Sequence, residues 1–295
     1  MKPPTDIDPT PDASRLAEFV ALVVAHGAEL YRDHPWRRTR DPYAVLLSEV
    51  MLQQTQVSRV EPRWGAWLEE FPTIDSLAGA PLEPVLVAWQ GLGYNRRAIA
   101  LKRAAEETVM RFGGVLPSDA AELRSLPGIG PATAAGVRAF AFDLPGVYLE
   151  TNVRTVVLHE LFPDRDDVSD REIVPVLESA VEEAARQGVS PRTWYYALLD
   201  YGAWLKREMP NPSRRSAHHT RQSRFEGSRR QKRAWLLRAV IADPGATTGE
   251  LGDALARIER DAGRDAPGPE ESLSVLEDLA RDGFVVRDGD GWFVA

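Results

Sequence analysis

The chain has 295 residues, of which 43% are hydrophobic, and it carries a formal net charge of −8 with no cysteine. This length suffices for two domains with cores of their own. The lack of cysteine excludes a disulfide framework, a thiol nucleophile and a cysteine-ligated zinc or iron–sulfur site. No apolar run approaches the roughly 20 residues that span a bilayer. The Pro- and Asp-rich start has no apolar segment of the kind found in signal peptides. We therefore expect a cytoplasmic protein without membrane contact.

Hydrophobic periodicity predicts a mainly helical chain. Residues 1–13 are rich in Pro and Asp, which predicts disorder. From there to residue 205, apolar residues recur at three- and four-residue spacing. The predicted helices are Leu16–Ala28, Ala44–Val57, Leu82–Trp89, Arg97–Phe112, Ala120–Leu126 and Ala132–Phe142. Ser118 is the predicted N-cap of one short helix, and Asp170 is the predicted N-cap of another. Strand-like runs are scarce here, which argues against a Rossmann or barrel enzyme.

Two glycines flank Ile129 in the string Leu126-Pro-Gly-Ile-Gly-Pro-Ala-Thr-Ala134, between two predicted helices. Gly128 and Gly130 permit positive φ and close backbone approach, and proline suits the first turn of the second helix. The N–H groups of this hairpin, together with Thr133, form a candidate site for a DNA phosphate. An ordinary turn between packed helices is the alternative, but the full string is far more specific than Gly-x-Gly alone.

A cationic segment lies between two acidic blocks. Residues 206–233 hold 10 basic and 2 acidic residues, whereas residues 1–205 and 234–295 have net charges of −9 and −7. Such a segment is a candidate site for a polyanion, although a solvated Arg-rich linker is an equal alternative.

The last 62 residues have the order of a winged helix. Helices are predicted at Trp235–Ala242, Thr248–Arg260 and Ser272–Arg281, followed by a hairpin around Asp288-Gly-Asp-Gly. The net charge of −7 opposes phosphate binding. Packing on the preceding domain, positioning the basic segment and binding an unidentified protein partner are the candidate roles.

The hairpin string resembles the helix-hairpin-helix of the HhH-GPD superfamily of DNA glycosylases. Other strings in family order extend the resemblance, which is greatest to MutY-type adenine glycosylases. They are Pro35-Trp-Arg, Asp41-Pro-Tyr, Ser48-Glu-Val-Met-Leu-Gln-Gln-Thr-Gln-Val57, Trp89-Gln-Gly-Leu-Gly-Tyr94, Asn152-Val-Arg and Asp200-Tyr-Gly-Ala203. The resemblance covers about residues 16–205, roughly two-thirds of the chain.

The resemblance implies a mainly α fold. Residues 14–205 would form a glycosylase domain of two helical subdomains, 206–233 a basic DNA-contacting linker, and 234–295 the winged-helix-like α+β domain. The implied partner is double-stranded DNA with a mispaired or damaged base, bound by a monomer at the nucleoid. The implied activity is hydrolysis of the N-glycosidic bond of a flipped base, first of all adenine in a mispair.

A glycosylase needs a carboxylate for bond cleavage and a wedge, that is, side chains that fill the gap left in the base stack by the extruded nucleotide. Glu49 lies in an otherwise apolar helix, which raises the pKa of a carboxyl group and suits a general acid. The resemblance makes it the residue that protonates the leaving purine and handles the water. It also places the wedge at Gln54 and Tyr94, which can pair with or stack on bases. A solvated Gln and a core aromatic are the alternatives for these two residues.

The second carboxylate departs from the family. The family has Asp just before the Asn-Val-(Lys/Arg) segment, where it stabilises the sugar cation; here Glu150 takes that slot, beside Asn152, which would orient the carboxylate or the water. A compensated pocket, a shifted substrate and a catalytically dead reader are the three interpretations, and we favour the first two.

The base pocket departs as well. The resemblance places the pocket at Trp36, Arg37 and Tyr196, and adenine-removing relatives often have Glu or Gln in the slot of Tyr196. Uracil, thymine or another damaged base is therefore an alternative substrate. A non-catalytic DNA-structure binder or winged-helix regulator is the alternative from another functional class.

The residues that would hold a cofactor or act as a nucleophile also differ from the family pattern. Relatives carry four iron–sulfur cysteines after the segment matching Asp200–Ala203, where this chain has Lys206 and Asn211-Pro-Ser-Arg-Arg-Ser216. We expect no cluster and no required cofactor, and phosphate contacts from Arg214, Arg215 and neighbouring arginines instead. His218 and His219 are interpreted as polar linker residues rather than metal ligands. The hairpin carbonyls of the superfamily can hold a structural monovalent cation, which no side-chain motif specifies.

A Schiff-base step is not expected. Bifunctional members of the superfamily place a Lys where this chain has Ala132, and the four lysines here all lie outside the motif. The prediction is a monofunctional enzyme that leaves an abasic site.

Overall fold

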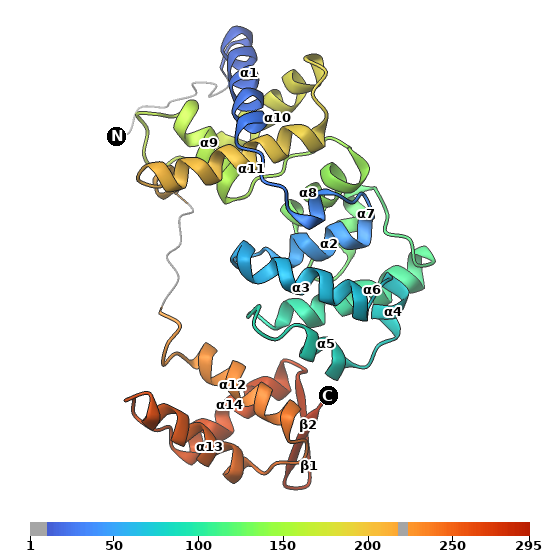
Figure 1. Ribbon diagram of the computed structural model, residues 1–295, viewed down its shortest axis with the longest axis vertical. Helices are drawn as coiled ribbons and strands as arrows, with labels where there is room; N and C mark the ends of the chain where they lie inside the picture. Colours follow the sequence, from blue (N-terminus) through green and yellow to red (C-terminus); the bar gives the residue numbers. More distant parts are fainter. Residues whose placement is uncertain (1–10, 218–223) are drawn as a thin grey trace, which may run out of the picture. The chain divides into compact units, whose positions relative to one another are not determined.

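The computed structural model describes residues 11–217 and 224–295 (Figure 1). Contacts between residues divide the chain into two compact units, each built from two stretches of sequence. One unit comprises Met1–Val50 and Leu116–Arg221, and the other comprises Met51–Val115 and Gln222–Ala295. The segment 14–205 expected to form the glycosylase domain is thus shared between the two units. Within the described residues, no helix is long and apolar enough to cross a membrane.

The first unit is built from helices around α11. Its elements are α1 (Ala13–Glu29), η1 (Pro35–Arg37), α2 (Pro42–Met51, whose last residue is counted with the second unit), α7 (Ala120–Ser125), α8 (Pro131–Phe142), α9 (Thr151–Glu160), α10 (Asp170–Arg186), α11 (Pro191–Glu208) and η2 (Pro212–Arg215). Helix α11 packs against α9 and α1, and α1 also packs against α10. The apolar stripe of α1 includes Phe19, Val20 and Val23, all buried at the spacing that one helix face requires.

The second unit holds the remaining helices and the strand pair. Its elements are α3 (Val57–Glu70), α4 (Ile74–Gly79), α5 (Leu82–Ala88), α6 (Arg96–Phe112), α12 (Arg229–Ala242), α13 (Thr248–Asp261), α14 (Pro269–Arg281), β1 (Val285–Asp288) and β2 (Gly291–Val294). Helix α4 packs against α6, and Trp67 meets Trp89 edge-on with 5.6 Å between ring centroids.

The C-terminal elements confirm the predicted order of three helices and a hairpin. Helices α12 and α13 both pack against α14. Strands β1 and β2 pair antiparallel, from Val285 opposite Val294 to Asp288 opposite Gly291 (Figure 1, red). Thr247 caps α13 and exchanges a capping box with Glu250, as its sequence favours. The mainly α fold class with a small α+β module is confirmed.

Several predicted boundaries were wrong, for local reasons. The predicted helix Ala44–Val57 ends at Met51, because Gln54 adopts φ 55° and a new helix starts at Val57. The cap before α7 is Asp119, not Ser118, because its carboxylate reaches the N–H groups of two residues in the first turn.

The N-terminal ends of two further helices differ from the predictions. Ser169, not Asp170, is the N-cap of α10, where it forms a capping box with Glu172. The predicted disorder over residues 1–13 does not include Asp12 and Ala13: Asp12 caps α1 by accepting from the backbone N–H of Arg15. Residues 1–10 lie outside the described part of the chain.

Candidate active site

The hairpin between α7 and α8 has the backbone geometry of an anion site. Gly128 adopts φ 74°, and Pro131 occupies the first turn of α8. Gly130 is extended (φ −82°). Only Gly128 therefore needs the left-handed region, although positive φ was expected to be used at both glycines. A Cβ on Gly130 would meet nothing within 4 Å, which leaves the backbone at the start of α8 open to close approach. Thr133 itself is only 7% exposed and faces the interior.

Glu49 projects from α2 towards α8. Leu46, Leu47 and Val50 around it are buried. A Cβ on Gly136 of α8 would stand 2.2 Å from Oε2 of Glu49, so the carboxylate fills a space that the glycine leaves free. Burial raises the pKa of Glu49 to about 8, and the charge of Glu150 adds to the rise. Glu49 is therefore mainly protonated at neutral pH.

Tyr148 is a site residue that sequence reasoning missed. It lies between α8 and α9, is 7% exposed, and its hydroxyl hydrogen-bonds the Glu49 carboxylate, which partly offsets the rise in the Glu49 pKa. Burial holds the pKa of Tyr148 well above its ordinary value, so the hydroxyl keeps its proton and donates. The ring packs edge-on against Phe140 and Tyr195, each at 5.4 Å. No motif marks Tyr148, because only packing brings it to Glu49.

Glu150 is the N-cap of α9. Its carboxylate accepts from the backbone N–H groups of Asn152 (2.5 Å) and Val153 (2.9 Å), and from the Asn152 amide at 3.3 Å. Burial raises the pKa of Glu150, while these hydrogen bonds and the nearby charge of Lys206 oppose the rise. The structure thus brings Asn152 against the carboxylate that it was expected to orient.

Helix α11 presses closely on this N-terminus. A Cβ on Gly202 would lie 2.2 Å from the carbonyl oxygen of Asn152, so a glycine is required where the two helices meet. Lys206 lies one turn further along α11 on the same face, half-buried. Burial lowers the pKa of Lys206, and the Glu150 charge opposes that fall. The sequence predicts Lys206 to lie outside the hairpin motif, and the fold places its charge near the second carboxylate.

The predicted base-pocket residues lie in the core beside this site. Arg37 pairs with Asp200 through Nη1 (2.6 Å) and Nη2 (2.8 Å), and the Arg37 and Asp200 side chains are 2% and 0% exposed. The Arg37 guanidinium lies 4.3 Å from the centroid of the Tyr196 ring, which stacks on Phe140 at 4.4 Å. Trp36 is also buried. Arg37 therefore braces Tyr196, and both its Nη groups are engaged by Asp200.

The two predicted wedge residues lie in the second unit. Gln54 follows α2 in a tight turn, and Tyr94 precedes α6 after the Gly-Leu-Gly turn. Both are exposed, Tyr94 by 40%, so Tyr94 is not a core aromatic. The Tyr94 hydroxyl accepts a hydrogen bond from Arg230 at 3.0 Å.

The two predicted phosphate-binding arginines of η2 differ in their exposure and in their hydrogen bonds. Arg214 is exposed. Arg215 instead donates to the carbonyl oxygens of Leu158 and Phe162, each at 2.7 Å, at the C-terminal end of α9. Arg215 thus stabilises the C-terminal end of α9, and its expected phosphate contact stays a prediction. Arg221, His218 and His219 lie outside the described residues.

The cluster position does not fit an iron–sulfur centre. The chain has no cysteine. In its place η2 packs against α9, and Val168 pairs with Ser216 through a single bridge that ties the segment down. No step of the chemistry proposed below involves a cluster.

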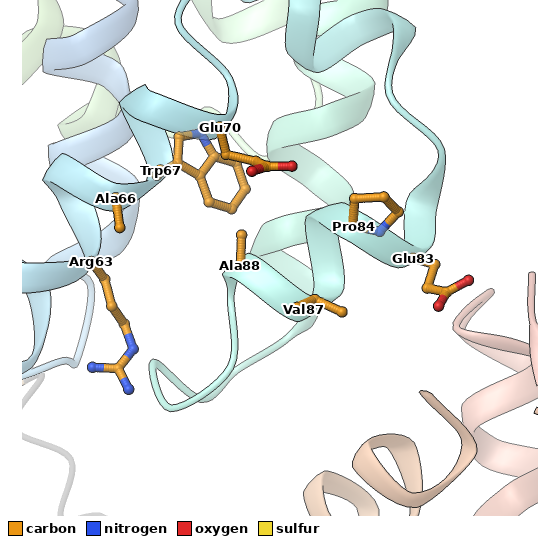
Figure 2. Close-up of a pocket in the computed structure, with 8 residues that line it drawn as sticks. All are labelled: Arg63, Ala66, Trp67, Glu70, Glu83, Pro84, Val87 and Ala88. Atoms are coloured by element: carbon orange, nitrogen blue, oxygen red, sulfur yellow. The ribbon is translucent and has the colours of Figure 1, made fainter. Parts of the chain in front are cut away.

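A surface hollow elsewhere contains none of the predicted site residues. Figure 2 shows it between α3 and α5, lined by Arg63, Ala66, Trp67, Glu70, Glu83, Pro84, Val87 and Ala88.

Comparison with known proteins defines the class of protein to which the chain belongs. Residues 47–187 match the model of the HhH-GPD superfamily of base excision DNA repair proteins. The adenine DNA glycosylase of Mycobacterium tuberculosis is 34% identical over 285 residues, which covers 89% of this chain and 88% of that protein. The chain belongs to the HhH-GPD superfamily of base excision DNA repair proteins, and the family resemblance is confirmed.

Within this superfamily the chain is similar to proteins named adenine DNA glycosylase. That of Mycolicibacterium smegmatis is 47% identical over 127 residues, 43% of either chain, so the match spans less than half of that relative. A solved thermostable thymine-DNA glycosylase aligns with TM-score 0.60 and 22% identity over 68% of this chain and 93% of its own, a likeness of fold.

Proposed function

We propose that the protein is a monofunctional DNA glycosylase that hydrolyses the N-glycosidic bond of adenine flipped from a mispair in double-stranded DNA. The observation that carries the proposal is the pair of half-buried carboxyl groups, Glu49 with a pKa of about 8 and Glu150 held by backbone N–H groups. Similarity to adenine DNA glycosylases over 89% of the chain supports the base. Its place of action would be chromosomal DNA in the cytoplasm.

Glu49 is the general acid of the proposed reaction. Because its pKa is about 8, the carboxyl group holds a proton at neutral pH. It delivers this proton to a ring nitrogen of adenine as the bond to C1′ breaks and its electron pair moves onto the base. Water then adds to C1′ and returns a proton to Glu49, which restores the enzyme. Tyr148 orients the carboxyl group through its hydroxyl hydrogen bond.

Glu150 stabilises the positive charge that develops on the sugar. The N–H groups at the start of α9 and the charge of Lys206 both favour its ionised form. Asn152 donates to the second oxygen and fixes the plane of the carboxylate. These contacts support the compensated-pocket interpretation of Glu in place of the family Asp.

The monofunctional assignment depends on the lysines. Lys206, near Glu150, is the lysine to test, because burial lowers its pKa. We expect no covalent adduct when borohydride is added to the protein bound to an abasic duplex. An adduct in good yield that disappears in Lys206→Gln would overturn the monofunctional assignment.

A panel of labelled duplexes tests the function. The duplexes carry A opposite 8-oxoguanine, A opposite G, U or T opposite G, hypoxanthine, and alkylated purines, each read with and without alkali. Strand cleavage only after alkali, confined to adenine and abolished by Glu49→Gln, is expected. The matched control Glu69→Gln removes an exposed carboxylate and should retain the wild-type rate. Release of another base would assign the alternative substrate. The absence of strand cleavage on every duplex, with DNA binding intact, would favour a non-catalytic DNA-binding protein.

A further inference from the structure

Two exposed side chains of the second unit sit on strained turns. Gln54 (φ 55°) and Tyr94 (φ 48°) are two of four described residues other than glycine with positive φ. This region is costly for residues with a Cβ and persists only where surrounding contacts enforce it. The contacts that enforce both turns converge on one side chain, Arg97 of α6.

Arg97 holds the turn that carries Gln54. Its Nη1 donates to the carbonyl oxygens of Met51 (3.0 Å) and Gln53 (2.7 Å), which precede Gln54. Its Nη2 donates to Oγ1 of Thr55 at 2.9 Å, directly after Gln54. The guanidinium therefore binds the backbone on one side of Gln54 and a side chain on the other.

The same guanidinium holds the turn that carries Tyr94. Nη2 donates to the carbonyl oxygens of Leu92 (3.2 Å) and Gly93 (3.0 Å). The indole of Trp89, fully buried, donates to the same Gly93 oxygen at 3.0 Å. The cation also lies 5.3 Å from the Trp89 ring centroid and 5.5 Å from that of Tyr94.

A direct link between the turns completes the arrangement. The Thr55 hydroxyl, which accepts from Arg97, donates to the Leu92 carbonyl oxygen at 3.1 Å. Arg97 is half-buried, and burial lowers its pKa to about 10, which still leaves it charged at neutral pH. A planar fork of donors is needed to satisfy carbonyl groups from two turns at once, which the single ammonium of Lys cannot reproduce.

We propose that Arg97 is a positioning residue that holds Gln54 and Tyr94 together as one rigid wedge, so that both enter the base stack of duplex DNA in register. The inference rests on the proposed function, since it assigns how that reaction gains access to a paired base. Arg97 need not touch DNA: it acts through the backbone on either side of two exposed side chains. Arg97 supports the opening of the duplex and takes no part in the bond cleavage at Glu49.

Two substrates separate these steps. One is a fully paired duplex with a single mispaired adenine; the other carries the same adenine in a bubble of unpaired bases, where no wedge is needed. Under single-turnover conditions, Arg97→Ala should release adenine from the duplex on the order of 100-fold more slowly, the cost of an ångström-scale misplacement. Its rate on the bubble should stay close to that of the wild type. Arg97→Lys should resemble Arg97→Ala.

Two further variants control for charge and folding. Arg103→Ala removes an exposed arginine two turns further along α6 and should match the wild type on both substrates. Thr55→Val keeps the side-chain shape and Arg97 itself, and deletes the hydroxyl that joins the turns. It should show a smaller loss confined to the duplex, which keeps the proposal testable if Arg97→Ala melts early.

A spectroscopic readout is independent of base release. In a Glu49→Gln background, 2-aminopurine next to the target adenine should brighten when the wedge opens the stack. Adding Arg97→Ala should abolish that rise while DNA binding persists. Equal losses on duplex and bubble, or an unchanged fluorescence rise, would overturn the proposal. If the wild type released no base from either substrate, the proposed function would fail, and the fluorescence would still decide the role of Arg97.

Discussion

The Glu49 carboxylate occupies a space that exists only because residue 136 is glycine. A Cβ at Gly136 would lie 2.2 Å from Oε2 of Glu49 and 3.0 Å from the Tyr148 ring. The first distance is shorter than real Cβ atoms adopt and the second is a tight contact, so α8 is matched to the acid on α2. The helix that follows the hairpin therefore also shapes the pocket of the proposed catalytic acid.

Gly136→Ala should move the carboxyl group and leave the fold intact. We expect the single-turnover rate of adenine release to fall roughly 100-fold, because ångström-scale displacement of a catalytic group has that cost. DNA affinity should change little. The matched control is Gly146→Ala, whose Cβ would meet its nearest neighbour at 3.9 Å, an ordinary contact. Equal rates for the two variants would contradict the steric argument.

Tyr148→Phe should change the pH profile as well as the rate. The hydroxyl lowers the Glu49 pKa from what burial alone would cause, so its removal should raise that pKa above about 8. Since the protonated acid is the active form, the alkaline limb of the rate profile should move to higher pH. The rate at neutral pH should fall about tenfold, because one lost orienting hydrogen bond is worth about 1.4 kcal/mol. An unmoved alkaline limb would show that Tyr148 is only a packing residue.

Glu49 should make stability depend on pH. Its folded pKa of about 8 exceeds the ordinary Glu pKa of 4.5, so the folded state binds the proton more tightly than the unfolded state. The resulting stabilisation is complete below about pH 4.5 and is lost as pH rises through 8. Glu49→Gln should therefore gain in melting temperature relative to wild type between pH 5 and 8. A constant difference between variant and wild type across that range would exclude the pKa shift.

Lys206→Gln should weaken catalysis through Glu150. The Lys206 charge opposes the rise in the Glu150 pKa caused by burial, so its loss should raise that pKa further. Because the proposed mechanism uses Glu150 as the ionised carboxylate, the acid limb of the rate profile should move to higher pH. Lys206→Arg keeps the charge and should restore most of the wild-type profile. Identical acid limbs in all three proteins would remove Lys206 from the site.

The adjacent residues Arg214 and Arg215 should separate binding from folding. Arg215→Ala deletes hydrogen bonds to the Leu158 and Phe162 carbonyl oxygens and should lower the free energy of unfolding by about 1–3 kcal/mol. Arg214→Ala should leave unfolding unchanged. If the exposed Arg214 contacts phosphate, the salt slope of DNA binding should fall by about 1. The reverse assignment, with Arg214 stabilising the fold, would contradict the structure.

The sequence alone determined the local features of this protein. Helical periodicity placed α1, α5, α6, α7, α8, α13 and α14 to within three residues, whereas one end of α2 and one end of α12 differed by six. The hairpin string predicted the turn at Gly128 and Pro131. Such features depend on neighbours three or four positions away, which the sequence shows directly. Glu49 stood out for the same reason, as one carboxyl group on an apolar helix.

Only the tertiary structure decided which residues meet. Tyr148 reaches Glu49 across about a hundred positions, Lys206 lies near Glu150, and Arg97 joins turns some forty residues apart. Arg215 donates to a carbonyl oxygen at the end of α9, a contact that no local pattern indicated. These pairings follow from how α8, α9 and α11 pack, and packing depends on the shape of whole helix faces rather than on any local pattern.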